Sequence, residues 1–248
     1  MPPEDGALRQ EIVATALAMS RRGLSPQRSG NVSARRGDSL LITPSATPYE
    51  AMQPADIVAA GLDGSLAAGQ RRPSTETPFH RAIYAARPDA QAIVHCHSPK
   101  ATALACARLP IPAFHYMVAV AGGADIRCAD YATFGTEALA ANSVAALTGR
   151  RACLLANHGQ VAIAASLEAA LELAAEVETL AGTYLDLLAS GQKVHILDEE
   201  EMARVLEAFE DYGRDDPWGA MWGSVTVQPG SDLTQPTGEV WNAESGNS

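Results

Sequence analysis

Gln91-Ala92-Ile93-Val94-His95-Cys96-His97 reads as a strand of this 248-residue chain, because after Gln91 it is apolar except for two histidines at alternate positions. A helix is predicted before it, from about Pro78 to Ala86. That helix ends at Arg87-Pro88, since the residue before a proline disfavours helical geometry. A second helix is predicted after it, from Lys100 to Arg108. A buried strand between two helices indicates a domain of mixed α and β structure.

Two hairpins are predicted on the N-terminal side of this strand. Val32 to Arg35 and Leu40 to Thr43 have the alternating pattern of paired strands. Ile57 to Leu62 and Ser65 to Ala68 flank Asp63-Gly64, which is the strongest short-range hairpin signal in the chain. Because neighbouring strands in a hairpin run antiparallel, the sheet is expected to be mixed or mainly antiparallel.

The rest of the chain adds helices at both ends and a further pair of strands. The expected elements are a helix from Leu8 to Met19, a helix from Thr136 to Leu147, strands Ala152 to Ala156 and Val161 to Ala164, and a long helix from Leu167 to Ala189. The composition changes after Arg214, where Gly, Pro, Ser, Asn and Thr dominate and all three tryptophans lie. We therefore expect a domain over 1–214 and a tail over 215–248, with Trp218 to Val227 docked on folded protein and Ser231 to Ser248 loosely held.

The charge of the chain limits its partners. Eighteen Lys and Arg against 29 Asp and Glu give a net charge of −11, which repels nucleic acid and anionic membranes. A small phosphorylated metabolite is compatible with this charge, because a local group of amides and hydroxyls can bind it. The N-terminus lacks the pattern of a secretion signal, and the longest strongly apolar stretch, Tyr116 to Ala121, is too short to span a bilayer. These features, with four scattered cysteines, predict a soluble, cytoplasmic protein.

Three histidines form a candidate metal site. His95 and His97 project to the same side of a strand, with Cα atoms roughly 6.5 Å apart, which allows both imidazoles to bind one ion. His158 is the best third ligand, because Asn157-His158-Gly159 forms a turn directly after an apolar run. One histidine alone is better explained as a hydrogen-bonded core residue, but the three together favour a metal such as zinc. The remaining histidines have no such partner and are expected to be structural: His80, His115 and His195.

Several polar turns are open to two explanations. Ser74-Thr75-Glu76-Thr77-Pro78 is typical of an ordinary helix start, and taken alone that explanation is the stronger. The alternative is that the two hydroxyls and the helix N-terminus bind a phosphate while Glu76 faces the metal as an acid or base. Ser29-Gly30-Asn31 and Thr43-Pro44-Ser45-Ala46 could likewise offer N–H groups to an anion.

Taken in order, the motifs of residues 7–213 resemble the class II aldolase/adducin family, and within it most closely the branch that acts on L-fuculose 1-phosphate. The matching motifs are Ser29-Gly30-Asn31-Val32-Ser33, Leu41-Ile42-Thr43-Pro44, Ser74-Thr75-Glu76, Arg87-Pro88-Asp89-Ala90, His95-Cys96-His97, Ile111 to Met117, Tyr131 to Thr136, Asn157-His158-Gly159 and Tyr212-Gly213.

The resemblance implies a role for each matching position. It makes His95, His97 and His158 the zinc ligands, and Glu76 both a metal-site acid and the catalytic acid/base. Tyr116 corresponds to the tyrosine that moves a proton at the aldehyde oxygen, and Tyr212 to one that enters the active site of an adjacent subunit. The positions that correspond to phosphate-binding residues are Gly30, Asn31, Ser45, Ala46, Ser74 and Thr75. At Ala46 and Thr75 the fuculose-phosphate branch has Gly and Ser.

The expected fold is therefore a three-layer α/β/α domain around a mixed, mainly antiparallel sheet, and the resemblance implies a homotetramer with active sites between subunits. The implied activity is zinc-dependent, reversible cleavage of a ketose 1-phosphate to dihydroxyacetone phosphate and an aldehyde such as L-lactaldehyde. A sugar-phosphate 4-epimerase, whose relatives carry Asp at the position of Glu76, and a metal-dependent decarboxylase are alternatives. A non-catalytic, adducin-like binding domain is an alternative of another class, which the retained histidines disfavour.

Overall fold

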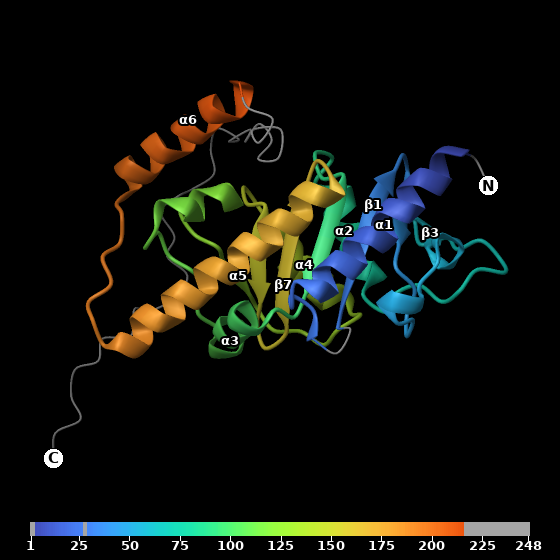
Figure 1. Cartoon of the computed structure of the whole chain (residues 1–248), viewed down its shortest axis with the longest axis horizontal. Coiled ribbons are helices and arrows are strands. Elements are labelled where there is room, and N and C mark those ends of the chain that lie inside the picture. The colour runs from blue at the N-terminus through green and yellow to red at the C-terminus, as the bar shows by residue number, and fades with distance from the viewer. Residues whose placement is uncertain (1–2, 27–28, 216–248) are drawn as a thin grey trace, which may run out of the picture.

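The computed structural model describes residues 3–26 and 29–215 of the chain. Figure 1 shows these residues as a layered body, with the last helix set apart from it at upper left. The predicted tail over 215–248 and its docked segment, Trp218 to Val227, fall almost entirely outside the described residues.

Among the described residues, seven strands form one sheet in the order β3-β2-β1-β4-β7-β6-β5. The strands are β1 (Gly30–Arg36), β2 (Ser39–Ile42), β3 (Val58–Gly61), β4 (Ala92–Cys96), β5 (Cys128–Ala129), β6 (Ala152–Leu155) and β7 (Gly159–Ala164). Every neighbouring pair is antiparallel except β5 with β6, which is parallel. The predicted mixed, mainly antiparallel sheet is confirmed.

Helices cover both faces of the sheet (Figure 1). Helices α1 (Pro3–Arg21), α3 (Pro99–Ala107) and α5 (Leu167–Ser190) share one core with Val94 of β4. Helices α2 (Thr77–Ala86) and α4 (Glu137–Ala146) share the other core with Ile93 of the same strand. Since successive strand residues point to opposite faces, the adjacent Ile93 and Val94 serve the two cores, and the predicted three-layer α/β/α fold is confirmed.

Two 3₁₀ segments precede β3, namely η2 (Tyr49–Ala51) and η3 (Pro54–Asp56). Another, η4 (Tyr116–Ala121), coincides with the longest strongly apolar stretch of the sequence. The final helix, α6 (Glu199–Asp215), packs Val205, Leu206 and Phe209 toward the core that contains α5. Neither α6 nor the two-residue strand β5 was predicted from the sequence.

One predicted hairpin is wrong. The strand expected at Ile57 to Leu62 is β3, but its partner is β2, and the segment Ser65 to Ala68 contributes only the isolated bridge between Ala60 and Leu66. The turn at Asp63-Gly64 does reverse the chain, as the hydrogen bond from Gly61 N to Ser65 O shows. Leu66 in the returning segment is 53% exposed, so burial contributes little to pairing there and the segment does not form a second strand.

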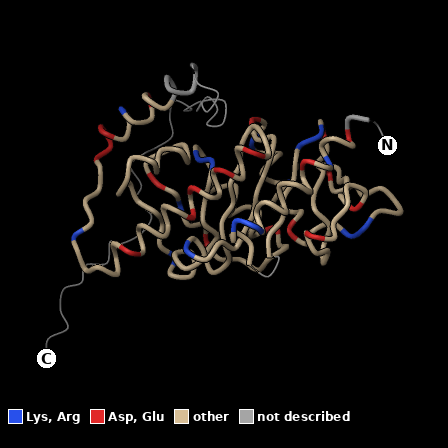
Figure 2. Tube along the Cα trace, viewed as in Figure 1, with Lys and Arg blue, Asp and Glu red and all other residues tan. Residues whose placement is uncertain are grey.

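Charged residues lie scattered along the trace, with Lys and Arg interspersed among Asp and Glu and a group of acids at the start of α6 (Figure 2). None of the helices in the described part of the chain combines the length and the hydropathy that a bilayer span needs.

Candidate active site

The four residues predicted as metal ligands come together near the middle of the sheet. One ligand atom from each of Glu76, His95, His97 and His158 lies within 4.8 Å of all the others. The Nε2 atoms of His95 and His97 are 3.1 Å apart. The carboxylate of Glu76 lies between two rings, with Oε2 3.0 Å from His95 Nε2 and Oε1 3.1 Å from His158 Nε2.

Two local features, a strand and a turn, place the three imidazoles. His95 lies within β4, where the backbone pairs with Asn31 on one side and Val161 on the other, and His97 follows the last residue of that strand. His158 lies in the turn between β6 and β7, after Asn157, whose φ of 55° is in the left-handed region that asparagine tolerates. The central strand therefore provides a rigid base for two of the rings, and a tight turn provides the third.

Glu76 is the N-cap residue of α2, but its side chain makes no capping hydrogen bond. Instead its Oε2 accepts a hydrogen bond of 2.8 Å from Asn31 Nδ2, and the carboxylate faces the imidazoles. Ser74 Oγ accepts from Glu76 N at 3.2 Å, outside the helix, so neither Ser74 nor Thr75 is the N-cap of α2. The segment keeps the Pro near the first helical position that an ordinary helix start has, but the Glu76 carboxylate belongs to the histidine cluster and does not cap the helix.

The electrostatics favour the ligand forms of Glu76 and His97. At His95 burial lowers the pKa, but the contact with Glu76 outweighs burial and raises this pKa in the metal-free cluster. Burial raises the pKa of Glu76, but His95 and His158 outweigh it and hold this pKa far below its usual range. Burial and the neighbouring rings of His95 and His158 lower the pKa of His97 to about 3. An ionised carboxylate and neutral imidazoles are the forms that coordinate a divalent metal ion.

The geometry fits a cation bound at this cluster. His95 Nδ1 lies 2.8 Å from the carbonyl oxygen of Gln160, so Nδ1 carries the hydrogen and Nε2 keeps a lone pair toward the cluster. Two nitrogens bound to one tetrahedral zinc ion at about 2.0–2.1 Å lie roughly 3.3 Å apart, close to the separation of the His95 and His97 nitrogens. Glu76 Oε1 is buried and has no well-formed hydrogen bond within the described structure. The donor set of three imidazoles and one carboxylate is typical of a transition-metal site.

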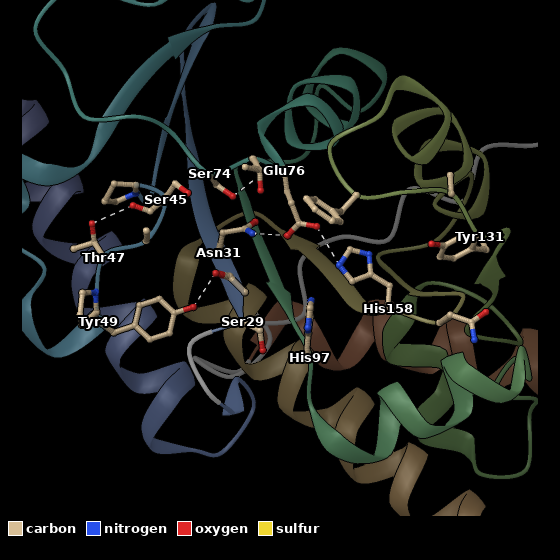
Figure 3. Close-up of a pocket in the computed structure, with 18 residues that line it drawn as sticks. Ser29, Asn31, Ser45, Thr47, Tyr49, Ser74, Glu76, His97, Tyr131 and His158 are labelled. Carbon is tan, nitrogen blue, oxygen red and sulfur yellow. Dashed lines mark hydrogen bonds and ion pairs between the residues drawn. The ribbon is translucent and has the colours of Figure 1, made fainter.

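A cavity of about 550 Å³ opens beside this cluster (Figure 3). All six residues at the predicted phosphate-binding positions line it: Gly30, Asn31, Ser45, Ala46, Ser74 and Thr75. Two of the polar turns are joined by backbone hydrogen bonds, from Ser45 N to Arg72 O at 2.9 Å and from Ser74 N to Thr43 O at 3.2 Å. The hydroxyls of Ser45 and Ser74 thus lie on one wall, with Glu76 and His158 beyond them (Figure 3).

Ala46 adopts a left-handed backbone conformation with φ of 56°. A glycine adopts this conformation without steric cost, whereas the Cβ of alanine disfavours it. The turn therefore keeps the geometry of a glycine turn and carries one additional methyl group at the cavity wall.

The structure describes the side chain of one of the two predicted catalytic tyrosines, Tyr116, and places it away from the cavity of this chain. Tyr116 lies at the start of η4, is 51% exposed, and stacks on Phe209 of α6 with ring centroids 6.4 Å apart. It is absent from the described residues that line the cavity. Tyr212 lies in α6 beyond the residues whose side chains the structure describes, so its role stays a prediction.

Three aromatic residues of the cavity wall were not predicted from the sequence, namely Tyr131, Phe134 and the buried Tyr49. Tyr131 and Phe134 line the cavity and are 54% and 64% exposed. They lie in the segment before α4, where no periodicity or spacing marks them as site residues. Of the histidines expected to be structural, His80 is fully buried and hydrogen-bonded, His115 accepts a hydrogen bond from Met117 N at the start of η4, and His195 lies in the segment between α5 and α6.

Comparison with known proteins gives consistent matches. A family model described as the class II aldolase and adducin N-terminal domain matches residues 10–185, which include the whole Glu and His cluster. A 5-methylthioribulose-1-phosphate/5-deoxyribulose-1-phosphate aldolase of Rhodospirillum rubrum is 49% identical over 213 residues, 86% of this chain and 96% of that protein. An L-fuculose phosphate aldolase of Escherichia coli O6:H1 is 48% identical over 210 residues, 85% and 97% of the two chains. A solved L-fuculose 1-phosphate aldolase structure has a TM-score of 0.78 at 40% identity, covering 82% of this chain and 96% of that one.

Proposed function

The chain belongs to the class II aldolase and adducin family, among its aldolases, and from this premise we propose that it catalyses reversible, zinc-dependent cleavage of a ketose 1-phosphate. The proposed substrate is L-fuculose 1-phosphate or a close analogue, and the products are dihydroxyacetone phosphate and an aldehyde such as L-lactaldehyde. One observation carries the proposal: a single carboxylate, Glu76, lies among three imidazoles at the wall of a cavity lined by polar turns.

Glu76 is the proposed proton donor and acceptor. A divalent ion held by His95, His97 and His158 would act as a Lewis acid that stabilises the negative charge developing on the oxygens of the triose fragment. In the synthetic direction the ionised Glu76 removes a proton from the carbon that bonds to the aldehyde. In the cleavage direction Glu76 first takes up a proton from water and then gives it to the carbon that loses the aldehyde. The hydrogen bond from Asn31 and the burial of the carboxylate fix the direction in which its oxygens point.

The polar turns position the substrate and take no part in bond cleavage. The proposed phosphate site consists of the Ser45 and Ser74 hydroxyls with four further residues that line the cavity: Gly30, Asn31, Ala46 and Thr75. Ser45 lies at the opposite end of the cavity wall from His158 (Figure 3). A phosphate held there places the reacting carbons beside Glu76, which converts binding energy into orientation. The negative net charge of the chain is compatible with this, because the site relies on local hydroxyl and amide groups.

Tyr116 is the proposed proton donor and acceptor at the aldehyde oxygen. We propose that it acts in the active site of a neighbouring subunit. Its exposure and its absence from the lining of its own chain's cavity support an action between subunits. We propose the same for Tyr212, together with a homotetramer in which each active site is completed by an adjacent chain.

A second substrate class agrees with the cavity wall and with the name of one relative. Tyr131 and Phe134 give the cavity an aromatic wall that suits an aldehyde with an apolar end. Such an end occurs in L-lactaldehyde and also in the aldehydes released from 5-deoxy or 5-methylthio ketose 1-phosphates, which the name of the R. rubrum aldolase includes. We therefore keep 5-methylthioribulose 1-phosphate as the alternative substrate.

An epimerase, a decarboxylase and a non-catalytic binding domain receive less support. The Glu76 carboxylate favours an aldolase over a 4-epimerase, and the similarity to proteins named as aldolases favours the same reaction over decarboxylation. A binding domain without catalytic activity does not need a buried carboxylate held among three imidazoles. A cytoplasmic location stays a prediction, with which the free thiols of all four cysteines agree.

A product assay tests the proposal. The metal-loaded protein is incubated with L-fuculose 1-phosphate, 5-methylthioribulose 1-phosphate and L-ribulose 5-phosphate, with and without a chelator. Release of dihydroxyacetone phosphate from either ketose 1-phosphate, lost with the chelator, is the expected result. Epimerisation of the pentose without cleavage, or no turnover of any of the three, would contradict it.

A further inference from the structure

A line of buried polar side chains runs from Glu76 away from the cavity, into the layer between the sheet and α2. Asn31 Nδ2 donates to Glu76 Oε2 at 2.8 Å, and Asn31 Oδ1 is hydrogen-bonded to His80 Nε2. His80 Nδ1 is 2.7 Å from Ser33 Oγ, which is 2.9 Å from the hydroxyl of Tyr84. Ser33, His80 and Tyr84 are at most 1% exposed, and Asn31 is 4% exposed. We call these four residues the Asn31–Tyr84 network.

The chemistry of the groups fixes the direction of every hydrogen bond in this network. An ionised carboxylate can only accept, so the nitrogen of the Asn31 amide faces Glu76 and its oxygen faces His80. That oxygen can only accept, so His80 carries a hydrogen on Nε2. When His80 is neutral, its Nδ1 accepts from the Ser33 hydroxyl, which in turn accepts from Tyr84. Donors therefore point along the whole network toward Glu76.

The surroundings of His80 keep it neutral. The ring is fully buried and stacks on Phe79 with centroids 4.5 Å apart. An imidazolium there would lose its hydration without gaining a contacting anion, because its two hydrogen-bond partners are a hydroxyl and an amide. Burial first, and the nearby His95, lower the pKa of His80 to about 3, in agreement with this geometry.

Backbone periodicity holds the network in place. Asn31 and Ser33 alternate along β1, so both project to the same face of the sheet. His80 and Tyr84 are four residues apart on α2, so they lie on the same side of that helix. Glu76 is the N-cap residue of the same helix. The network therefore links the start of α2 to β1, the strand that pairs with β4, in which His95 lies.

We infer that His80 is a positioning residue, which holds the Asn31 amide so that its nitrogen donates to Glu76 and thereby aligns this carboxylate for proton transfer. The inference rests on the proposed function for the proton-transfer role of Glu76. Among the described residues, only His80 Nε2 donates to Asn31 Oδ1, so without this donor the Asn31 amide is free to rotate away from Glu76.

Two substitutions of His80 test the inference. His80→Leu fills the site but cannot donate, whereas the side-chain amide of His80→Gln can donate to Asn31 Oδ1. For each variant kcat and KM are measured with the ketose 1-phosphate that the protein cleaves, and kcat is expressed per metal-loaded site. We expect His80→Leu to lower kcat about 10- to 100-fold, with KM within about threefold of the wild type, and His80→Gln to restore most of kcat. Ser143→Ala, which removes a buried hydroxyl in α4 in the layer that also holds α2, is the control and should leave kcat unchanged.

Equal losses of kcat in the two His80 variants, or a wild-type kcat in His80→Leu, would overturn the inference. Should His80→Leu fail to fold, ¹⁵N NMR of the wild-type histidine rings decides. A hydrogen on Nε2 of His80 supports the network, and a hydrogen on Nδ1 alone contradicts it. If the wild-type protein cleaves no ketose 1-phosphate, the proposed function fails, while the tautomer measurement still decides whether His80 holds Asn31.

Discussion

Glu76 contacts two histidines of the cluster and is also the proposed acid and base, so one substitution can separate the two roles. Glu76→Gln keeps an oxygen beside the rings but cannot exchange a proton near neutral pH. We expect the variant to bind metal and to lose about 10²- to 10⁴-fold in kcat. Metal content and kcat are measured on the same sample. Glu178→Gln, which alters a carboxylate bound to Lys100 N and Ala101 N, is the control. Wild-type kcat in Glu76→Gln would remove Glu76 from the mechanism.

His80 makes stability depend on pH in the metal-free protein. The pKa of a histidine in the unfolded chain is near 6.5, and burial, with the nearby His95, lowers that of folded His80 to about 3. Between these values the unfolded state binds the additional proton, so the free energy of unfolding falls as the pH is lowered. This contribution is complete above about pH 6.5 and is lost toward about pH 3, at about 1.4 kcal/mol per pH unit.

Urea unfolding at about pH 7 and about pH 5, in the presence of a chelator, measures this effect. The wild type should lose about 2 kcal/mol more than His80→Gln between the two pH values, because His97 contributes equally to both proteins. Identical losses would show that His80 is already protonated in the fold or is not buried.

At the level of elements, the turn between β6 and β7 packs closely against the end of β4, and this close packing requires a glycine at position 159. A Cβ at Gly159 would lie 2.5 Å from the carbonyl oxygen of Cys96 and 2.9 Å from His97 Cδ2. Gly159→Ala should therefore lower the free energy of unfolding by about 1–3 kcal/mol and weaken metal binding, because the strand end and His97 must move. Calorimetry for metal affinity and urea unfolding for stability measure the two effects.

Gly182→Ala is the matched control. Its Cβ would make an ordinary contact of 3.5 Å with Lys100 Cγ inside α5, where alanine is preferred to glycine. We expect this variant to be more stable by about 0.5–1 kcal/mol, with unchanged metal affinity. A Gly159→Ala protein that matches the wild type in both measurements would contradict the close packing of turn and strand.

The elements that the sequence predicts well are those with a continuous apolar run or a clear helical period. All residues of β4 are buried, and the alternation of its side chains predicts that His95 and His97 share a side. The burial of α5 follows the helical period from Leu167 to Ala181. The strand partner of β3 could not be predicted in the same way. The Asp63-Gly64 turn is a local signal, whereas the pairing with β2 depends on burial of Val58 and Ala60 against a distant helix.

The parts of the candidate site that could be predicted are those in which the residue types themselves indicate a chemistry. Contacts that arise only when distant segments fold together could not be predicted. Three histidines and Glu76 indicate metal chemistry from the sequence, although local spacing alone favours an ordinary helix-start acid at Glu76. The contact of Asn31 with Glu76 joins residues 45 positions apart, and His80 reaches the site only through Asn31. No local pattern encodes either contact, because both arise from the packing of α2 on β1.

For the whole molecule, the proposed action of Tyr116 in a neighbouring subunit predicts complementation. Tyr116→Phe and Glu76→Gln should each be nearly inactive as homotetramers. When the two variants are coexpressed and the mixed tetramers isolated, about a quarter of the sites should combine an intact Glu76 with an intact Tyr116 from the next chain. Turnover near a quarter of the wild-type value is the expected result. Turnover equal to the mean of the two separate variants would place Tyr116 outside the neighbouring active site.

The proposed chemistry depends on three imidazoles that bind one divalent ion beside Glu76. Anomalous diffraction at the zinc edge, from crystals of the zinc-loaded protein, locates that ion without reference to activity. We predict one peak per chain at about 2.0–2.1 Å from the Nε2 atoms of His95, His97 and His158. Crystals with no peak at these rings, or with the only zinc bound elsewhere on the chain, would contradict it.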